Sequence, residues 1–348
     1  MSAGPTNDTM NVVNILRRLV LAVVLLLGAA VLGLSPVCSA AAPVEPGIPA
    51  EIGQFYQEGH YDQAIEALEA AIGKAPADAT LHYWLGRSYY ELSDYGKSIS
   101  SLDRAVTLDS SNAEYHLWLG LACGRKAEES NMFTAFGLAR RTHHEFQVAV
   151  QLDKTNLEAQ RDLIRFMLNA PGFLGGGDDH ALQQMAALAL VDPVQADLAR
   201  AEYFASRKKF DQAAEQYGRL LRSDRHKPGV YFEIAEYYRD RDDPEDMKKC
   251  LDIVSKVSPA DQRMDYYLGV QLVLANSDPG AAEKYLRMYL ADVPANSAFP
   301  SQSSAHEWLG KLYEAQNRPD QAADEYRTAL SLNSRNKDAR EGLKRVEK

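Results

Sequence analysis

The chain has 348 residues, of which 46% are hydrophobic and 25% are charged, so we expect a globular protein or an extended repeat array with a large core. Its formal net charge of -10 at pH 7 argues against nucleic acid and anionic lipid as its main partners. Its three cysteines are too few for a disulfide scaffold.

Residues 1–42 are predicted to be a secretory signal peptide. Arg17 and Arg18 precede the apolar run LVLAVVLLLGAAVLGL at 19–34, and small residues follow that run. A basic, then an apolar, then a small-residue region is typical of exported proteins. The run is also shorter than the roughly 20 residues of a membrane-spanning helix. We therefore expect cleavage near residues 40–42 and a periplasmic or envelope-associated protein of a bacterium.

A lipid anchor on Cys38 is the alternative fate of this segment, and it would make the protein a structural lipoprotein adaptor. The preceding residues, SPV, match a bacterial lipidation signal poorly, because Val37 stands where a small residue is expected. We expect membrane contact only through the signal segment or through a lipid on Cys38.

The rest of the chain repeats one pattern. The segment YDQAIEALEAAIGKAPADA at 61–79 is followed about 34 residues later by YGKSISSLDRAVTLDSSNA at 95–113. The same order of residues returns at 210–228 and at 319–337. A second helical pattern precedes each segment, for example LHYWLGRSYYELSD at 81–94. Alanine and large residues recur at spacings of four and three, which places them on one face of a helix.

These segments resemble the tetratricopeptide repeat, a 34-residue helix–turn–helix unit, over about residues 45–336. The positions that carry the resemblance are, in the first helix, Leu85-Gly86-Tyr89, Leu119-Gly120, Leu268-Gly269 and Leu309-Gly310-Tyr313 and, in the second helix, Ala64-Leu68-Ala71-Pro76, Ala213-Tyr217 and Ala322-Tyr326-Ala329. The resemblance implies an all-α fold, a right-handed α-solenoid or superhelix. Each helix pair is too small to bury its own apolar stripe, so neighbouring pairs must stack.

We expect about eight repeats in a domain at 43–348. Their predicted ranges are 45–78, 79–112, 113–156, 157–193, 194–227, 228–261, 262–296 and 303–336. The charged segment at 337–348 is expected to form a capping helix. The polar, proline-containing segment at 295–304 is expected to be an exposed loop.

Two neighbouring repeats are longer than the others. Repeat three holds about ten extra residues around KAEESNMFTAFGLARR at 126–141, and repeat four holds the stretch NAPGFLGGGDDHA at 169–181. We expect both inserts to lie in the turn between the two helices of their repeat and to touch. The phrases FTAFGLAR and APGFLGGG together also resemble a group of exported bacterial tetratricopeptide proteins, a resemblance that implies no reaction chemistry. The apolar residues at 132–136 and 172–174 make this insert edge a second candidate docking surface.

The glycine-rich stretch lacks the Lys and Ser or Thr of a phosphate-binding loop, and it offers two carboxylates instead. The residues that could together hold a metal ion are His143 and His144, at the expected start of the second helix of repeat three, and Asp178, Asp179 and His180. In the simpler interpretation, which we favour, Asp178 or Asp179 caps the following helix and the glycines provide the turn. A periplasmic metal- or small-ligand-binding protein is the alternative function.

The resemblance also implies a partner-binding groove lined by the first helix of each repeat. The residues it assigns to the groove are Tyr83, Arg87, Tyr90, Arg125, Arg161, Arg165, Glu202, Phe232, Glu236 and Tyr266. Arginine binds carboxylates with two hydrogen bonds, so a basic, aromatic surface suits an extended peptide. In the alternative interpretation these arginines pair only with carboxylates such as Glu91, Glu114 and Glu158.

The sequence contains none of the motifs G-x-S-x-G, H-E-x-x-H or C-x-x-C, and it has no dinucleotide-binding fingerprint. The expected protein is therefore not an enzyme and has no cofactor. We expect a protein–protein interaction scaffold of the bacterial cell envelope that binds a protein or extended peptide in its groove. Trp84, Trp118 and Trp308 are expected in the core, as are Cys123 and Cys250.

Overall fold

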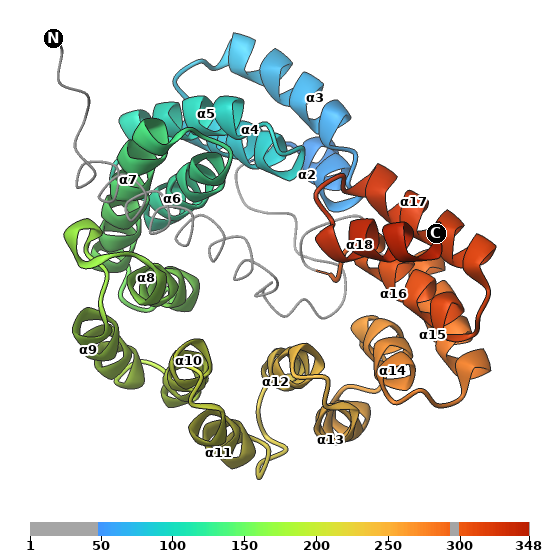
Figure 1. Ribbon diagram of the computed structural model, residues 1–348. Helices are drawn as coiled ribbons and strands as arrows, with labels where there is room; N and C mark the ends of the chain where they lie inside the picture. The colour runs from blue at the N-terminus through green and yellow to red at the C-terminus, as the bar shows by residue number, and fades with distance from the viewer. Residues whose placement is uncertain (1–47, 293–298, 348) are drawn as a thin grey trace, which may run out of the picture. The chain divides into compact units, whose positions relative to one another are not determined.

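The computed structural model describes residues 48–292 and 299–347, and its regular elements in these two ranges are all helices (Figure 1). There are 17 α-helices and one short 3-10 helix, and no strand occurs in the described residues. The prediction of an all-α fold is confirmed. The predicted signal peptide at 1–42 lies outside these ranges. No helix in the described part of the chain is long and apolar enough to cross a membrane.

The chain divides into two compact units, one that includes residues 60–217 and one that includes residues 218–347. The helices up to the boundary are α2 (Ala50–Gln57), α3 (Tyr61–Lys74), α4 (Ala79–Glu91), α5 (Tyr95–Leu108), α6 (Ala113–Glu128), α7 (Met132–Leu152), α8 (Leu157–Asn169), η1 (Gly172–Leu174), α9 (Asp178–Ala189), α10 (Pro193–Ser206) and α11 (Phe210–Leu220). The helices of the second unit are α12 (Pro228–Asp240), α13 (Pro244–Val257), α14 (Arg263–Leu274), α15 (Pro279–Asp292), α16 (Gln302–Ala315), α17 (Pro319–Leu332) and α18 (Lys337–Val346).

Several helices begin at a side chain that accepts hydrogen bonds from free backbone N–H groups. Asp78 accepts from the backbone of Thr80 at 2.9 Å, and Asn156 accepts from the backbone of Ala159 at 2.9 Å. Such caps satisfy donors that have no partner within the helix, which fixes where the helix starts. From α3 to α10 and from α12 to α18 consecutive helices pack together, and α4 also contacts α6, the first helix of the next pair.

The two helices of a pair approach each other at the Leu-Gly step. A methyl group on Gly86 of α4 would lie 2.5 Å from Cγ of Leu102 in α5, and one on Gly120 of α6 would lie 2.6 Å from the ring of Phe146 in α7. Both distances are too short for real carbon atoms, so only glycine permits this approach. Trp84, Trp118 and Trp308 precede the step and are buried, as predicted. Cys123 and Cys250 are likewise buried and carry free thiols.

In three of the first helices, a side chain near the start of the helix forms a hydrogen bond with the turn that precedes it. His82 donates to the carbonyl of Pro76 at 3.1 Å, His116 faces the carbonyl of Ser110 at 3.1 Å, and Gln160 donates to the carbonyl of Lys154 at 2.5 Å, six residues back in each case. Carbonyl groups of the turn therefore find their partner in the repeat that follows.

His116 lies in a buried ion pair between α6 and α7. Its Nδ1 is 2.7 Å from Oε2 of Glu145, and its Nε2 faces the carbonyl of Ser110. Both partners are acceptors, so the ring must carry a proton on each nitrogen and is a cation. The hydrogen bond with Glu145 raises the pKa of His116, which burial alone would lower. Arg141 of α7 also contacts Glu145, with its Nε 3.5 Å from Oε1.

The extra residues of repeat three do not lie in a turn, so that prediction is wrong. They lengthen the two helices: α6 runs to Glu128, α7 has 21 residues, and only residues 129–131 separate them. Asn131 accepts hydrogen bonds from the backbone of Phe133 and Thr134 and so starts α7 early. His143 and His144 consequently lie inside α7 rather than at its start. The predicted loop at 295–304 lies partly outside the described residues, and its last residues, from Gln302, begin α16.

Substitution of Gly86 by alanine tests the close approach of α4 and α5. We expect Gly86→Ala to lower the free energy of unfolding by about 1–3 kcal/mol, because the new methyl group displaces Leu102. Gly73→Ala in α3 is the matched control, since a methyl group there meets nothing within 4 Å. Alanine should stabilise that helix by about 0.5–1 kcal/mol. Urea unfolding followed by circular dichroism measures both; equal effects of the two substitutions would contradict the packing argument.

The buried cation predicts a pH dependence of stability. Because the pKa of His116 is raised in the folded chain, its stabilising contribution is complete below the unfolded value of about 6.5 and is lost as the pH rises through the folded pKa. We expect the melting temperature of the wild type to fall more steeply above neutral pH than that of His116→Gln. His82→Gln, which removes only a carbonyl contact, should retain the wild-type slope. Parallel slopes for all three proteins would rule out a charged His116.

Candidate partner-binding surface

The ten residues predicted to line a groove all lie on first helices of the repeats. In the first unit they are Tyr83, Arg87 and Tyr90 on α4, Arg125 on α6, Arg161 and Arg165 on α8 and Glu202 on α10, and in the second unit they are Phe232 and Glu236 on α12 and Tyr266 on α14. We call the seven residues of the first unit the first-helix row. Its members differ in burial and in how their charges are balanced.

Arg87 is surrounded by aromatic rings. Its guanidinium carbon lies 4.2 Å from the ring centre of Trp118, 4.5 Å from Trp84 and 5.0 Å from Tyr56. The only hydrogen bond it makes among the described residues goes from Nη1 to the hydroxyl of Tyr83 at 3.3 Å, and its buried Nε has no partner there. Cation–π contacts at these distances are attractive, but they leave the N–H donors at the edge of the guanidinium unused. Arg87 can therefore still bind an anionic group.

Sequence reasoning assigned Arg87 to the surface but missed the rings of Tyr56 and Trp118 that hold it. The available signal was the recurrence of tryptophan immediately before the Leu-Gly step in consecutive repeats, at Trp84 and Trp118. Both tryptophans are core residues, as predicted, and each also turns its face to the same cation.

Arg125 and Tyr90 continue the row. Arg125 donates from Nη1 to Glu128 at 3.0 Å and from Nε to the hydroxyl of Tyr95 at 3.3 Å. Tyr90 packs edge-to-face against Tyr95 and Trp118, with ring centres 5.4 Å apart in both pairs. Arg125 keeps about a quarter of its side chain exposed, so it remains accessible to a partner.

Arg161 and Arg165 share one carboxylate. Their Nη2 atoms lie 2.5 Å and 2.9 Å from Oε1 of Glu202, and Arg161 also donates to Gln195 at 3.0 Å. Arg165 contacts Asp162 as well, at 3.4 Å. This cluster joins α8 to α10. The mutual pairing of arginines and carboxylates, which the sequence left open, thus holds for this end of the row, with Glu202 as the central acceptor.

The residues assigned to the second unit lie among aromatic side chains. Phe232 stacks on Tyr267 with ring centres 4.8 Å apart, and the guanidinium of Arg263 lies 4.4 Å from its ring centre. The hydroxyls of Tyr266 and Ser304 are 2.7 Å apart. Glu236 accepts a hydrogen bond from Tyr267 at 2.7 Å, and burial raises the pKa of this carboxyl above its usual range.

Four of the ten assigned residues are buried side chains and cannot present a free surface as they stand. They are Tyr83, Arg161, Phe232 and Tyr266, of which Arg161 is only 1% exposed. Their large rings or stems fill the space between successive first helices, and this packing takes precedence over the exposure that repeat position alone predicts. Arg87, Tyr90, Arg125, Arg165, Glu202 and Glu236 are the partly exposed members.

The glycine-rich insert of repeat four forms a compact turn against α7. The helix η1 follows Pro171, and α9 begins at Asp178 with Gly177 as its N-cap. A methyl group on Gly176 would lie 1.8 Å from the carbonyl oxygen of Ala170, and one on Gly175, at a φ of 89°, would strike the ring of His143. The glycines are thus required by close approach. The inserts do touch, as predicted: Phe136 of α7 stacks on Phe173 at 6.1 Å.

Asp178 does not cap α9, contrary to our expectation. Its carboxylate accepts hydrogen bonds from the hydroxyl of Tyr203 at 3.1 Å and from Nε of Arg207 at 3.0 Å, and the hydrogen bond from Arg207 is the main reason that its pKa is lowered. As the first residue of α9 it still benefits from the helix dipole. The side chain instead ties α9 to α10.

The histidines and aspartates of the insert edge do not form a metal site within the described residues, where no group of three possible ligands occurs together. His143 stacks on Phe166 with ring centres 5.1 Å apart. Burial, with smaller effects from His180 and His144, lowers its pKa. Asp178 is committed to Arg207. The insert edge is therefore built by packing and ion pairing.

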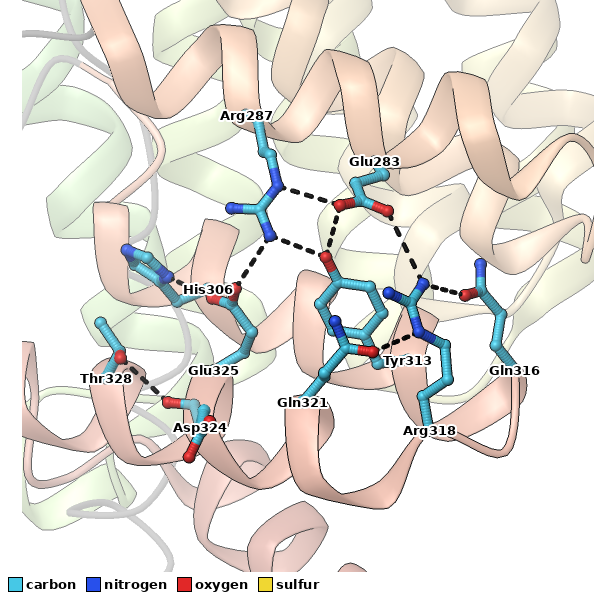
Figure 2. Close-up of polar contacts among 10 residues, drawn as sticks. All are labelled: Glu283, Arg287, His306, Tyr313, Gln316, Arg318, Gln321, Asp324, Glu325 and Thr328. Carbon is cyan, nitrogen blue, oxygen red and sulfur yellow. Dashed lines mark hydrogen bonds and ion pairs between the residues drawn. The ribbon is translucent and has the colours of Figure 1, made fainter.

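A polar network in the second unit connects α15, α16 and α17 (Figure 2). Tyr313 donates to Glu283 at 2.5 Å and accepts from Arg287 at 2.7 Å, and Arg287 also reaches Glu325 at 3.3 Å. Nδ1 of His306 lies 2.6 Å from the other oxygen of Glu325. These contacts hold the three helices together.

Comparisons with known proteins agree with this architecture. Family models described as tetratricopeptide repeat match residues 54–113, 85–128 and 303–336. The structure of yeast Tom70 matches at a TM-score of 0.60 and 14% identity, covering 93% of this chain and 68% of that chain, a likeness that shows the fold alone. A tetratricopeptide repeat protein from Parabacteroides merdae matches at a TM-score of 0.44 and 15% identity, covering 86% of this chain and 96% of that chain. No curated protein matches in the sequence comparison.

Removal of the shared carboxylate tests the cluster on α8 and α10. We expect Glu202→Gln to lower the free energy of unfolding by about 3 kcal/mol, because it removes the negative charge that lies 2.5 Å from the buried Arg161. Asp197→Asn on the same helix removes an exposed partner of Arg200 and should cost less than about 1 kcal/mol. Thermal and urea unfolding of the two variants provide the comparison; similar losses would show that Arg161 does not depend on Glu202.

Proposed function

Since the chain is a tetratricopeptide-repeat protein, we propose that it is a non-catalytic scaffold of the bacterial cell envelope that binds a protein or extended peptide along the first helices of its repeats. The observation that carries this proposal is Arg87, a cation held by aromatic rings, with N–H donors that no described carboxylate occupies. A guanidinium that already lies in place loses little entropy when it binds a carboxylate.

The neighbouring residues of the row suit a peptide that continues beyond this anchor. Tyr90 lies on α4, the helix of Arg87, and Arg125 lies on α6, the next first helix, and each keeps part of its surface exposed. Aromatic and arginine side chains dominate the binding energy of protein interfaces. The carboxylate of Glu202 neutralises the positive charges of Arg161 and Arg165, so the unneutralised part of the row lies at its α4 end. We propose that the partner places its acidic group there.

The proposed envelope location rests on the sequence of residues 1–42. The order of basic residues, apolar run and small residues is that of an exported chain. Two buried, free cysteines in the described residues are compatible with an oxidising compartment, because burial raises the pKa of the Cys123 thiol to about 12 and suppresses its reactivity.

Site-specific photo-crosslinking in the producing bacterium tests this function. A photoreactive phenylalanine replaces Arg125 in the row or, as the matched control, Arg104 on α5, an exposed arginine of a second helix. We expect a defined cross-linked product in the envelope fraction from position 125 and none from position 104. Arg87→Ala in the position-125 variant should reduce its yield about tenfold, since loss of an anchoring arginine typically removes most of the affinity.

Circular dichroism of each variant verifies that the fold is retained. Equal cross-linking from both positions, or a product that is indifferent to Arg87→Ala, would contradict binding along the first-helix row. Recovery of the protein in the cytoplasmic fraction would contradict the envelope location. The cross-linking result would still test the binding surface independently.

A further inference from the structure

One face of α7 carries an exposed stripe that the proposed function does not use. The stripe consists of Phe133, Phe136, Gly137, Arg140 and His144, whose spacing places them along one side of the helix. All of these residues except His144 belong to the insert of repeat three. We refer to these five residues as the α7 stripe.

Two phenylalanines of the stripe are exposed to water. Phe133 is 84% exposed and Phe136 is 39% exposed. Phe173 of η1, which is 58% exposed, stacks on Phe136 and widens the apolar patch. Contiguous exposed apolar side chains are typical of a site of contact with another molecule.

The other end of the stripe carries the cation Arg140 and the imidazole of His144. Neither Arg140 nor His144 makes a hydrogen bond or ion pair in the described residues, whereas the adjacent Arg141 contacts Glu145 and also reaches Asp103 at 3.1 Å. The stripe is thus aromatic at its N-terminal end, and its cation, Arg140, lies toward its C-terminal end.

This arrangement is complementary to itself. If a second copy of α7 lies antiparallel across the first, about a two-fold axis between residues 138 and 139, Phe133 of each copy faces His144 of the other. Gly137 of each copy then faces Arg140 of the other copy. The guanidinium of this Arg140 can extend over the ring of Phe136, which is next to Gly137 in the chain. The guanidinium of Arg140 is attracted to an aromatic face, and a two-fold interface requires a self-complementary patch of this kind.

Gly137 has no explanation within the single chain. A methyl group there would meet nothing within 4 Å, and glycine in the middle of a helix is less favourable than alanine. At the crossing point of two helices, however, glycine allows the backbones to approach closely and leaves space for the long side chain of Arg140.

We propose that the α7 stripe is the contact surface of a homodimer in which the α7 helices of two copies cross antiparallel. The stripe spans about 16 Å, so the interface is small and we expect a dissociation constant on the order of tens of micromolar. The net negative charge of each chain causes the two copies to repel each other. The contacts of Arg140 and the phenylalanines of the stripe provide a local attraction that opposes this repulsion.

Analytical ultracentrifugation of the protein, in the form in which its producing cell processes it, tests the proposal. The wild type should change from monomer to dimer as its concentration rises from about 1 to about 200 micromolar. Gly137→Lys should remain monomeric over this range, because it places a second cation against Arg140. Phe133→Ala should weaken the dimer at least about tenfold, since aromatic anchors dominate small interfaces.

Gly73→Lys is the matched control, because Gly73 is also an exposed helical glycine with open space around it. It should dimerise as the wild type does. A wild type that stays monomeric, or a dimer that Gly137→Lys leaves intact, would overturn the proposal. Because the two glycine sites are open, all variants should keep the melting temperature of the wild type within a few degrees.

Discussion

The close approach of paired helices at the Leu-Gly step is the constraint on which the rest of the structure depends. At Gly86 and Gly120 the backbone of a first helix lies directly on a side chain of the second, with no room for another carbon atom. The tryptophan before the step is a core residue, and Trp84 packs edge-to-face against Tyr56 of the preceding repeat. The same geometry turns the other side of the first helix outward, and that side carries the residues of the candidate partner-binding surface.

Different interactions hold the arginines at the two ends of the first-helix row. Arg161 and Arg165 are neutralised by a carboxylate from the next first helix, so their charges serve the packing of α8 on α10. Arg87 is held by ring faces that attract the cation without occupying its hydrogen-bond donors. Glu91 and Glu158 act on Arg87 electrostatically, but neither accepts a hydrogen bond from it, so its N–H donors stay available to a partner. This difference singles out the α4 end of the row.

The fold was predictable because its signal recurs at a fixed spacing, and each Leu-Gly step reinforces the others. The inserts were harder to place, since a count of extra residues does not say whether they form a turn or lengthen helices. In repeat three, Asn131 caps the start of α7 and the residues after it favour a helix, so the extra residues lengthen the helices. Asp178 was misassigned because its acceptor role depends on Arg207, 29 residues away. The burial of Arg161 could not be predicted either, because it depends on Glu202 in the next repeat.

The hydrogen bonds from His82, His116 and Gln160 back to the preceding turn bear on how such a chain can grow by duplication. Donor and acceptor lie six residues apart, on opposite sides of the point where a first helix begins. A recombination event that cuts at the start of α4, α6 or α8 would join a donor to a foreign turn. A copied segment would keep donor and acceptor from the same parent only if it included the preceding turn together with the first helix.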